Sequence, residues 1–254
     1  MKSDRKFYLF FVWTALLTVP FYALGYFYPK AGPAGLPLSF LSICIPLALA
    51  AVYAYREGRW VSVRRMFLGI TEAHKAWPMT LIFSALGLPL VALLAYKTAM
   101  LSPNGLPEHP AVAWAQVPLM FLLYFLAAFA EEVGWTFTLT PALVRRHGKW
   151  AAGAMIGLFW GLWHVFPWSL SHSLPWVAGM FVFTVVLRLF IVHNWTQKGS
   201  LLTAVLAHTM SNVGMFAFPN EGSHLNPWVF AFWTALLLAV QLGVEWRLRH
   251  PRPE

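Results

Sequence analysis

The sequence predicts an all-α, polytopic membrane protein, and three observations lead to this class. Of the 254 residues, 59% are hydrophobic and only 11% are charged, and the mean hydropathy is +0.61. The apolar residues are gathered in runs of about 20, the length that crosses a hydrocarbon core of roughly 30 Å. Backbone groups in lipid must be hydrogen-bonded within the span, so the runs are expected to be helices. This composition excludes a soluble globular enzyme, a disordered tail protein and a collagen-like fibre.

Eight apolar runs qualify as transmembrane helices, and no linker or low-complexity tract separates them. The chain is therefore predicted to form one bundle and a single integral membrane domain, 1–254. The first run is longer than the apolar part of a signal peptide and lacks a small-residue cleavage site, so we interpret it as a retained span. The fourth run exceeds a straight crossing, and we expect it to tilt, bend or extend beyond the bilayer. The predicted spans are residues 7–28, 37–55, 77–99, 111–142, 151–168, 174–194, 200–218 and 227–246.

The lysines and arginines predict how the spans are oriented. With the N-terminus inside, 15 of the 18 basic residues fall in inside segments, and two, Lys30 and Lys97, fall outside. This asymmetry places both termini in the cytoplasm, and we expect an inner-membrane protein of a bacterium. The formal charge of +9 then reflects loops beside a lipid bilayer, so no nucleic-acid partner is expected. The inside residues are Lys2, Arg5, Lys6, Arg56, Arg59, Arg64, Arg65, Lys75, Arg145, Arg146, Lys149, Lys198, Arg247, Arg249 and Arg252.

The segment 56–76 mixes apolar and basic residues, and two interpretations of it are open. It contains Trp60, Val61 and Phe67 among four arginines. Such a mixture is typical of an amphipathic helix that lies on the inner membrane surface. An ordinary solvated basic loop would have the same composition.

Two adjacent carboxylates, Glu131 and Glu132, interrupt the fourth apolar run. A charged residue in the middle of a span costs about 2.5–3.5 kcal/mol on insertion scales. Two neighbouring carboxylates also repel each other, so one must be protonated or both must have partners. The alternative is that the pair marks the cytoplasmic end of the span, with 133–142 as an amphipathic extension.

Two other spans carry polar groups that can meet these carboxylates. The fifth holds His164, four residues after Trp160, and the seventh holds His208 and Asn212, which share one helix face. In an apolar bundle such groups are best satisfied when they converge. Counting about 1.5 Å per residue along each span places them in the middle and inner half, compatible with a site open to the cytoplasm.

Glycines repeat at every fourth position of the fifth span, at Gly153, Gly157 and Gly161. Small residues at this spacing let a second helix approach closely. We therefore expect a packing face without chemistry of its own, which would help to seat His164 near its partners.

These residue types permit amide hydrolysis. A carboxylate beside a histidine can take a proton from water, and a second histidine with an asparagine amide can donate hydrogen bonds to an oxyanion. Glu, two His and Asn are thus sufficient without a covalent intermediate. His and Glu are also zinc ligands, but the chain contains no H-E-x-x-H sequence. We expect no metal and no other cofactor.

The ordered set resembles the signature of a known family, the CAAX-protease and bacteriocin-processing (CPBP, or Abi) family of intramembrane glutamic proteases. That signature has three parts, E-E-x-x-x-R, [FW]-x-x-x-H and H-x-x-x-[ND]. The resemblance covers residues 120–218, which it identifies as a catalytic core. The matching segments run from Glu131 to Thr136, from Trp160 to His164 and from His208 to Asn212.

The resemblance implies eight helices enclosing a conical cavity that is open to the cytoplasm and the membrane. It implies that Glu131 activates the hydrolytic water with the assistance of His164. It also implies that His208 and Asn212 stabilise the oxyanion and that Glu132 supports the site.

The chain departs from the signature at one position, because Thr136 stands where the family has arginine. Arg188, the only Lys or Arg within a predicted span, is a candidate replacement partner for Glu132. Alternatively, Arg188 extends its side chain to the inner end of the sixth span.

The sequence therefore favours an intramembrane endopeptidase that acts on a membrane-anchored or hydrophobic peptide. Two alternatives are a non-catalytic immunity or scaffold protein of the same fold and a proton-coupled transporter. Neither the substrate nor the oligomeric state can be inferred from the sequence.

Overall fold

The computed structural model describes residues 2–32, 37–101, 114–215 and 225–250, and the regular secondary structure in these ranges is entirely helical. The predicted all-α membrane class is thereby confirmed. The helices are α1 (Lys2–Phe27), α2 (Cys44–Leu68), α3 (Pro78–Ile82), α4 (Leu88–Met100), α5 (Val117–Glu132), α6 (Thr140–Ser169), α7 (Leu174–Thr196), α8 (Leu201–Met215) and α9 (Pro227–Arg249). Short 3₁₀ segments are η2 (Leu38–Ile43), η3 (Gly69–Lys75) and η5 (Trp114–Gln116), and two π-helical segments are η4 (Phe83–Gly87) and η6 (Val133–Leu139).

Six helical stretches in the described part of the chain are long and apolar enough to cross a membrane. One of them, Trp114–Ser169, contains 56 residues and combines the fourth and fifth predicted spans. The described part of helix α8 has 15 residues, fewer than the roughly 20 that a crossing needs. The count of eight therefore stays a prediction. The ends of two predicted spans, 111–113 and 216–218, and the predicted inside residue Arg252 lie outside the described residues.

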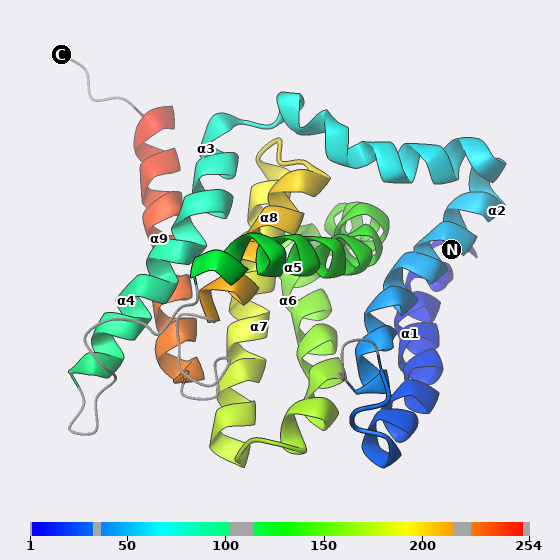
Figure 1. Cartoon of the computed structure of the whole chain (residues 1–254). Coiled ribbons are helices and arrows are strands. Elements are labelled where there is room, and N and C mark those ends of the chain that lie inside the picture. Colours follow the sequence, from blue (N-terminus) through cyan, green and yellow to red (C-terminus); the bar gives the residue numbers. More distant parts are fainter. Residues whose placement is uncertain (1, 33–36, 102–113, 216–224, 251–254) are drawn as a thin grey trace.

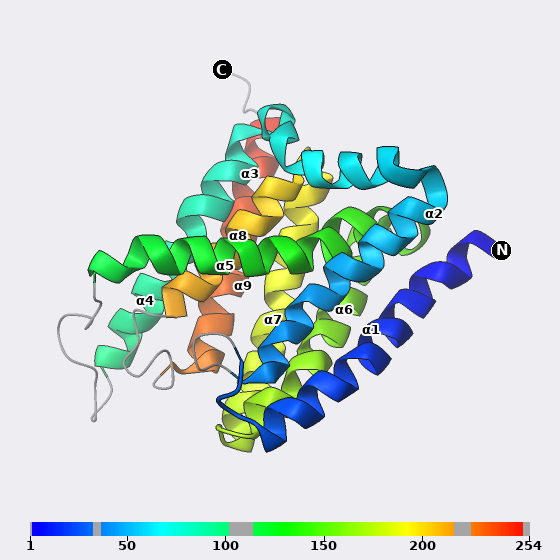
Figure 2. The ribbon, with the colours of Figure 1, turned by 45° about the vertical axis from the view of Figure 1, so that its right-hand side comes forward.

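Helix α5 runs across the bundle instead of along it (Figures 1 and 2). It packs against α2 and α8, while α6 packs against α7 and α7 against α9. After α5 the chain continues through the π-helical η6 into α6, which is interrupted at Gly148 with a φ of 78°. The fourth predicted span, 111–142, ends before Gly148, so the expectation that it tilts, bends or extends beyond the bilayer stays a prediction. The sequence-based estimate of how deep Glu131 lies in the membrane counted residues along this span. Such counting assumes a helix parallel to the others, whereas α5 runs across them.

Helices α6 and α7 approach closely along the predicted glycine face. A Cβ atom at Gly157 would lie 2.9 Å from the Cα of Val185 and 3.1 Å from the Cβ of Arg188. Only a glycine fits this position without moving the α7 backbone, so the stripe has the packing role that the sequence predicted. The stripe also brings Arg188 of α7 next to α6.

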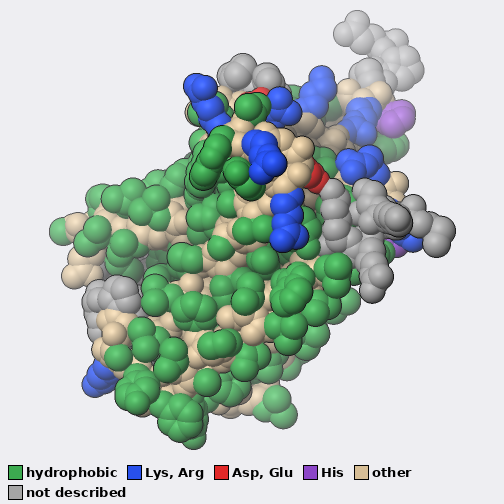
Figure 3. All heavy atoms as spheres, turned by 90° about the vertical axis from the view of Figure 1, so that its right-hand side faces the viewer, with side chains coloured by type: hydrophobic (Ala, Val, Ile, Leu, Met, Phe, Trp, Pro, Cys, Tyr) green, Lys and Arg blue, Asp and Glu red, His purple; other side chains and the backbone are tan. Residues whose placement is uncertain are grey.

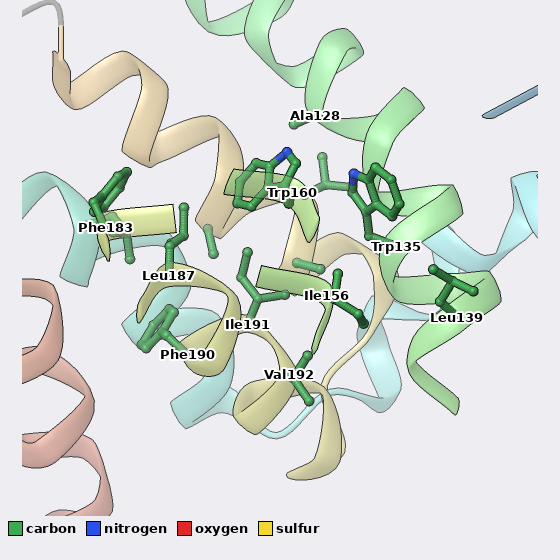
Figure 4. Close-up of a cluster of buried hydrophobic side chains, with 14 of the residues drawn as sticks. Ala128, Trp135, Leu139, Ile156, Trp160, Phe183, Leu187, Phe190, Ile191 and Val192 are labelled. Atoms are coloured by element: carbon green, nitrogen blue, oxygen red, sulfur yellow. The ribbon is translucent and has the colours of Figure 1, made fainter. Parts of the chain in front are cut away.

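A cluster of buried apolar side chains fills the space where these helices meet (Figure 4). It includes Trp135 of η6, Ile156 and Trp160 of α6, and Leu187 and Phe190 of α7, each at most 5% exposed. Dense apolar packing on several sides holds these elements in fixed relative positions. The polar residues of the predicted site lie at the edge of this cluster.

The segment 56–76 is helical, so the loop interpretation is wrong. Helix α2 turns sharply at Gly58 and Arg59 and continues to Leu68, and η3 follows directly. The part after the turn crosses the upper end of the bundle (Figure 1). Lysine and arginine side chains gather at this end on the face shown in Figure 3, while most of that face is apolar. This end is called the basic end below; its placement on the cytoplasmic side stays a prediction.

Candidate active site

The two adjacent glutamates occupy the junction between α5 and the π-helical η6. The wider π turn is accompanied by hydroxyl groups that bond carbonyls five residues earlier, such as Thr140 Oγ1 to the carbonyl of Trp135 at 2.8 Å. Segments of this kind occur often at functional sites. Glu131 is 4% exposed and Glu132 is fully buried. Both carboxylates are thus buried where α5 ends, and the alternative that the pair marks the cytoplasmic end of the span stays a prediction.

Glu131 accepts hydrogen bonds from two indole groups. Nε1 of Trp160 lies 2.7 Å from its Oε2, and Nε1 of Trp135 lies 3.2 Å from the same oxygen. The two indole nitrogens lie on the sides of the rings that face each other (Figure 4). Both donors are neutral, so they orient the carboxylate without cancelling its charge.

Glu132 is neutralised by a buried arginine. NH1 and NH2 of Arg188 donate to its two oxygens, both at 2.8 Å, and both side chains are fully buried. Nδ1 of His208 lies 3.0 Å from Oε1 of Glu132. Because a carboxylate accepts, His208 donates from Nδ1 and keeps Nε2 for another partner. Arg188 does not reach toward the membrane surface, so that interpretation of it is wrong.

Thr136 lies beside this ion pair. Its hydroxyl donates to Oε2 of Glu132 at 2.5 Å and accepts from NH1 of Arg188 at 3.3 Å. The guanidinium of Arg188 also lies over the ring of Trp160, 4.6 Å from its centroid. A cation from α7 thus occupies the space next to position 136, where the signature has an arginine on the helix of the glutamates.

His164 is held by its own helix and by aromatic rings. Its Nδ1 lies 2.8 Å from the carbonyl oxygen of Trp160, so Nδ1 donates and the neutral ring offers Nε2 as an acceptor. Its ring stacks on Trp168 with a centroid distance of 5.0 Å and meets Trp163 edge-on at 4.9 Å. The imidazole therefore has a defined orientation at the wall of the cavity.

A single cavity of about 370 Å³ is lined by all four residues predicted to be catalytic, Glu131, His164, His208 and Asn212. The supporting residue Trp160 lines it as well. Glu132, Thr136 and Arg188 are not among the lining residues and form a buried layer behind His208. The structure thus brings all eight predicted site residues into one region.

The cavity extends away from the basic end. Its far wall is formed by Phe40 of η2, Tyr22 near the end of α1 and Trp168 near the end of α6. These segments lie in the lower half of the bundle in Figure 1, opposite the basic surface helix. The walls of the cavity are mainly aromatic and aliphatic, and the expectation that the site opens to the cytoplasm stays a prediction.

Two tryptophans that the sequence analysis did not single out belong to the site. Trp135 bonds Glu131, and Trp168 stacks on His164. Each stands four residues after the side chain that it contacts, so the helical spacing that pairs Trp160 with His164 would have found both.

A second polar cluster lies outside the cavity, between α6, α7 and α9. Nε2 of His193 lies 3.1 Å from Glu245, and Nζ of Lys149 lies 3.1 Å from Nδ1 of the same histidine. Gln241 donates to Glu245 at 2.8 Å and to Asn194 at 2.6 Å. In the described ranges, no group of three or more His, Cys, Asp or Glu side chains is placed to hold a metal ion, in this cluster or elsewhere.

Comparison with known proteins finds one family to which the region of the site is similar. Residues 113–214 match the family model described as Rce1-like, type II CAAX prenyl endopeptidase. A curated protein of Methanococcus maripaludis, named CAAX prenyl protease 2, is 28% identical to this chain over 108 residues. The match covers 38% of this chain and 39% of that relative, so it spans well under half of the relative's length. The region matched by the family model contains the segments from Glu131 to Asn212.

Proposed function

We propose that the chain, whose residues 113–214 match the Rce1-like family model, is an intramembrane endopeptidase of the CPBP type. It would hydrolyse a peptide bond in a membrane-anchored or hydrophobic peptide. One observation carries the proposal. Glu131 lines the cavity with only neutral indole donors on its bonded oxygen, while the adjacent Glu132 is paired with Arg188. Two neighbouring carboxylates thus have environments that suit different tasks.

In the proposed mechanism, Glu131 is the general base. It takes a proton from a water molecule, whose oxygen attacks the scissile carbonyl carbon and forms a tetrahedral oxyanion. The two indole hydrogen bonds keep the carboxylate oriented toward the cavity. The C–N bond then breaks, and the leaving amine receives the proton. His164, with Nδ1 occupied by the Trp160 carbonyl, can exchange protons through Nε2.

The oxyanion would be stabilised from α8. The amide group of Asn212 can donate to it, and His208 can donate from Nε2 when both ring nitrogens carry a proton. In that state Nδ1 donates to Glu132, whose position is held by Arg188. Glu132 and Arg188 therefore act as positioning residues that do not touch the substrate.

The lining of the cavity supports an apolar substrate. Phe40, Met180, Phe183 and Leu187 contribute to its walls. Apolar walls with few convergent polar groups are typical of sites that take a hydrophobic ligand. Because the Methanococcus relative is named a CAAX prenyl protease, prenylated C-terminal peptides are the first class to test, and unmodified hydrophobic peptides are the second.

The test uses purified protein in liposomes with one peptide of each class. Mass spectrometry of the products should show new peptide termini with the wild-type protein and none with Glu131→Ala. Glu245→Gln is the matched control, because it alters a buried carboxylate outside the cavity and should cleave as the wild type does. Equal cleavage by Glu131→Ala would contradict the proposal. Elemental analysis of protein purified without chelator separates this mechanism from a metal-dependent one.

A non-catalytic membrane protein of the same fold is the second candidate, and Thr136 favours it because the signature arginine is absent there. This alternative predicts that the double change His164→Ala and His208→Ala leaves the cellular phenotype intact. A proton-coupled transporter would instead show pH-dependent flux in liposomes that contain no substrate peptide.

A further inference from the structure

The length of the second helical stretch shows that part of it cannot cross the bilayer. The stretch Leu38–Glu72 has 35 residues, whereas one crossing needs roughly 20. The excess begins at a sharp turn, where Gly58 has φ −149° and Arg59 has φ 56°, a left-handed conformation that is uncommon for arginine. The Arg59 side chain lies over the ring of Tyr55, 5.4 Å from its centroid, which ties the turn to the preceding helix.

The helix after the turn has two different faces. Val63 and Met66 are buried against the bundle, at 8% and 0% exposure. The other face exposes Trp60 at 73% and Val61 at 70%. Arg64 and Arg65 are exposed between these residues and Leu68.

Neither bulk water nor the hydrocarbon core suits this outer face. Exposed tryptophan, valine and leucine disfavour water, and two exposed arginines disfavour hydrocarbon. The boundary between headgroups and acyl chains accommodates both kinds of side chain. The helix also crosses the basic end of the bundle, as an interfacial helix must (Figure 1).

The charge of the segment indicates which headgroups it prefers. Residues 56–76 contain five Lys or Arg and two Asp or Glu, and the basic side chains gather at this end of the molecule (Figure 3). We propose that residues 59–72 form an interfacial helix that binds anionic phospholipid headgroups of the membrane. Trp60, Val61 and Leu68 would insert at the acyl boundary while Arg64 and Arg65 contact phosphates.

This surface connects to the elements of the cavity. At the end of the helix, a Cβ atom on Gly69 would lie 3.1 Å from the ring of Phe137 in η6 and 3.8 Å from Leu201 at the start of α8. Helix α8 carries His208, and η6 follows the two glutamates directly. The inference itself does not depend on the proposed peptidase activity.

A spin label can report where the helix lies. The label is attached at Val61→Cys in a Cys44→Ser background, and the protein is reconstituted in phosphatidylcholine with or without phosphatidylglycerol. Access of oxygen and of a water-soluble nickel chelate should place the label at the headgroup–acyl boundary. Phosphatidylglycerol should reduce its mobility. A label that is fully open to the nickel chelate in both membranes would overturn the proposal.

Charge variants test the choice of partner. Arg64→Gln with Arg65→Gln should weaken the retention of phosphatidylglycerol, measured by native mass spectrometry, about fivefold per arginine and about thirtyfold for the pair. Lys30→Gln with Lys97→Gln removes the same charge from other exposed positions and should leave retention unchanged. Equal retention by all proteins would overturn the proposal. So would a label that is immobilised only at high protein-to-lipid ratio, since that would indicate a second copy of the chain on this surface.

Discussion

The protein should tolerate loss of the Arg188 side chain only if another positive charge is placed beside Glu132. The change Arg188→Met removes both 2.8 Å hydrogen bonds and leaves a fully buried carboxylate with Thr136 and His208 as its remaining partners. Breaking a buried ion pair from one side costs about 3–5 kcal/mol, a large share of the 5–15 kcal/mol that stabilises a typical domain. We expect a loss of this size in the free energy of unfolding, measured by denaturant titration in micelles. Cleavage should fall with it, since His208 loses its fixed acceptor.

Adding Thr136→Arg to Arg188→Met should restore most of this loss. Thr136 already touches Glu132 through its hydroxyl, and the deleted guanidinium leaves room next to it, because NH1 of Arg188 lies 3.3 Å from that hydroxyl. The double variant would carry the arginine at the position where the family signature has it. Thr136→Arg alone should destabilise the protein, since it places a second cation in an occupied, buried space.

Two results would refute this reasoning. One is an Arg188→Met protein with wild-type stability, which would mean that the ion pair contributes nothing. The other is a double variant that is no more stable than Arg188→Met, which would mean that position 136 cannot substitute for the arginine on α7.

Three further predictions follow from contacts described above. Trp160→Phe removes the 2.7 Å bond to Glu131, and the loss of a hydrogen bond to a charged group, about 1.5–3 kcal/mol, should lower kcat roughly 10- to 100-fold with little change in folding. Gly157→Val should destabilise the α6–α7 contact by about 1–3 kcal/mol, measured by denaturant titration, because a Cβ there lies 2.9 Å from the Cα of Val185. Gly157→Ala should cost less. Equal stability of the wild type and both variants would contradict the packing role. Glu245→Gln should lower stability by about 1–3 kcal/mol and leave cleavage unchanged, whereas a large loss of kcat would show that the second polar cluster belongs to the site.

The residues of the site could be predicted from the sequence because polar groups are rare in apolar spans. Within apolar spans, such side chains find hydrogen-bond partners mainly in one another. The structure brings Glu131, His164, His208 and Asn212 to one cavity. The ordered family signature narrowed the choice of site residues further. Their proposed catalytic roles stay predictions.

The division of labour between the two glutamates could not be predicted. In a regular helix, adjacent residues point about 100° apart, and nothing in the sequence states which one faces the cavity. The answer depends on the π-helical segment after Glu132 and on the arginine from α7, which is 56 residues away in sequence. Long-range ion pairs of this kind carry no local signal.

The end of the bundle toward which the cavity extends could not be predicted from the sequence either. The estimate of depth assumed that the helix of Glu131 crosses the membrane along the bundle, but α5 runs across it (Figure 2). How a helix tilts is determined by its neighbours, here α2 and α8, and not by its own composition.

The rate of peptide cleavage by purified Glu131→Gln tests the central claim most directly. Glutamine keeps the size of the side chain and an oxygen for the indole donors, but it cannot take a proton from water. The account predicts a loss of kcat of about 10²- to 10⁴-fold with unchanged stability. A Glu131→Gln protein that cleaves at the wild-type rate would show that another group activates the water.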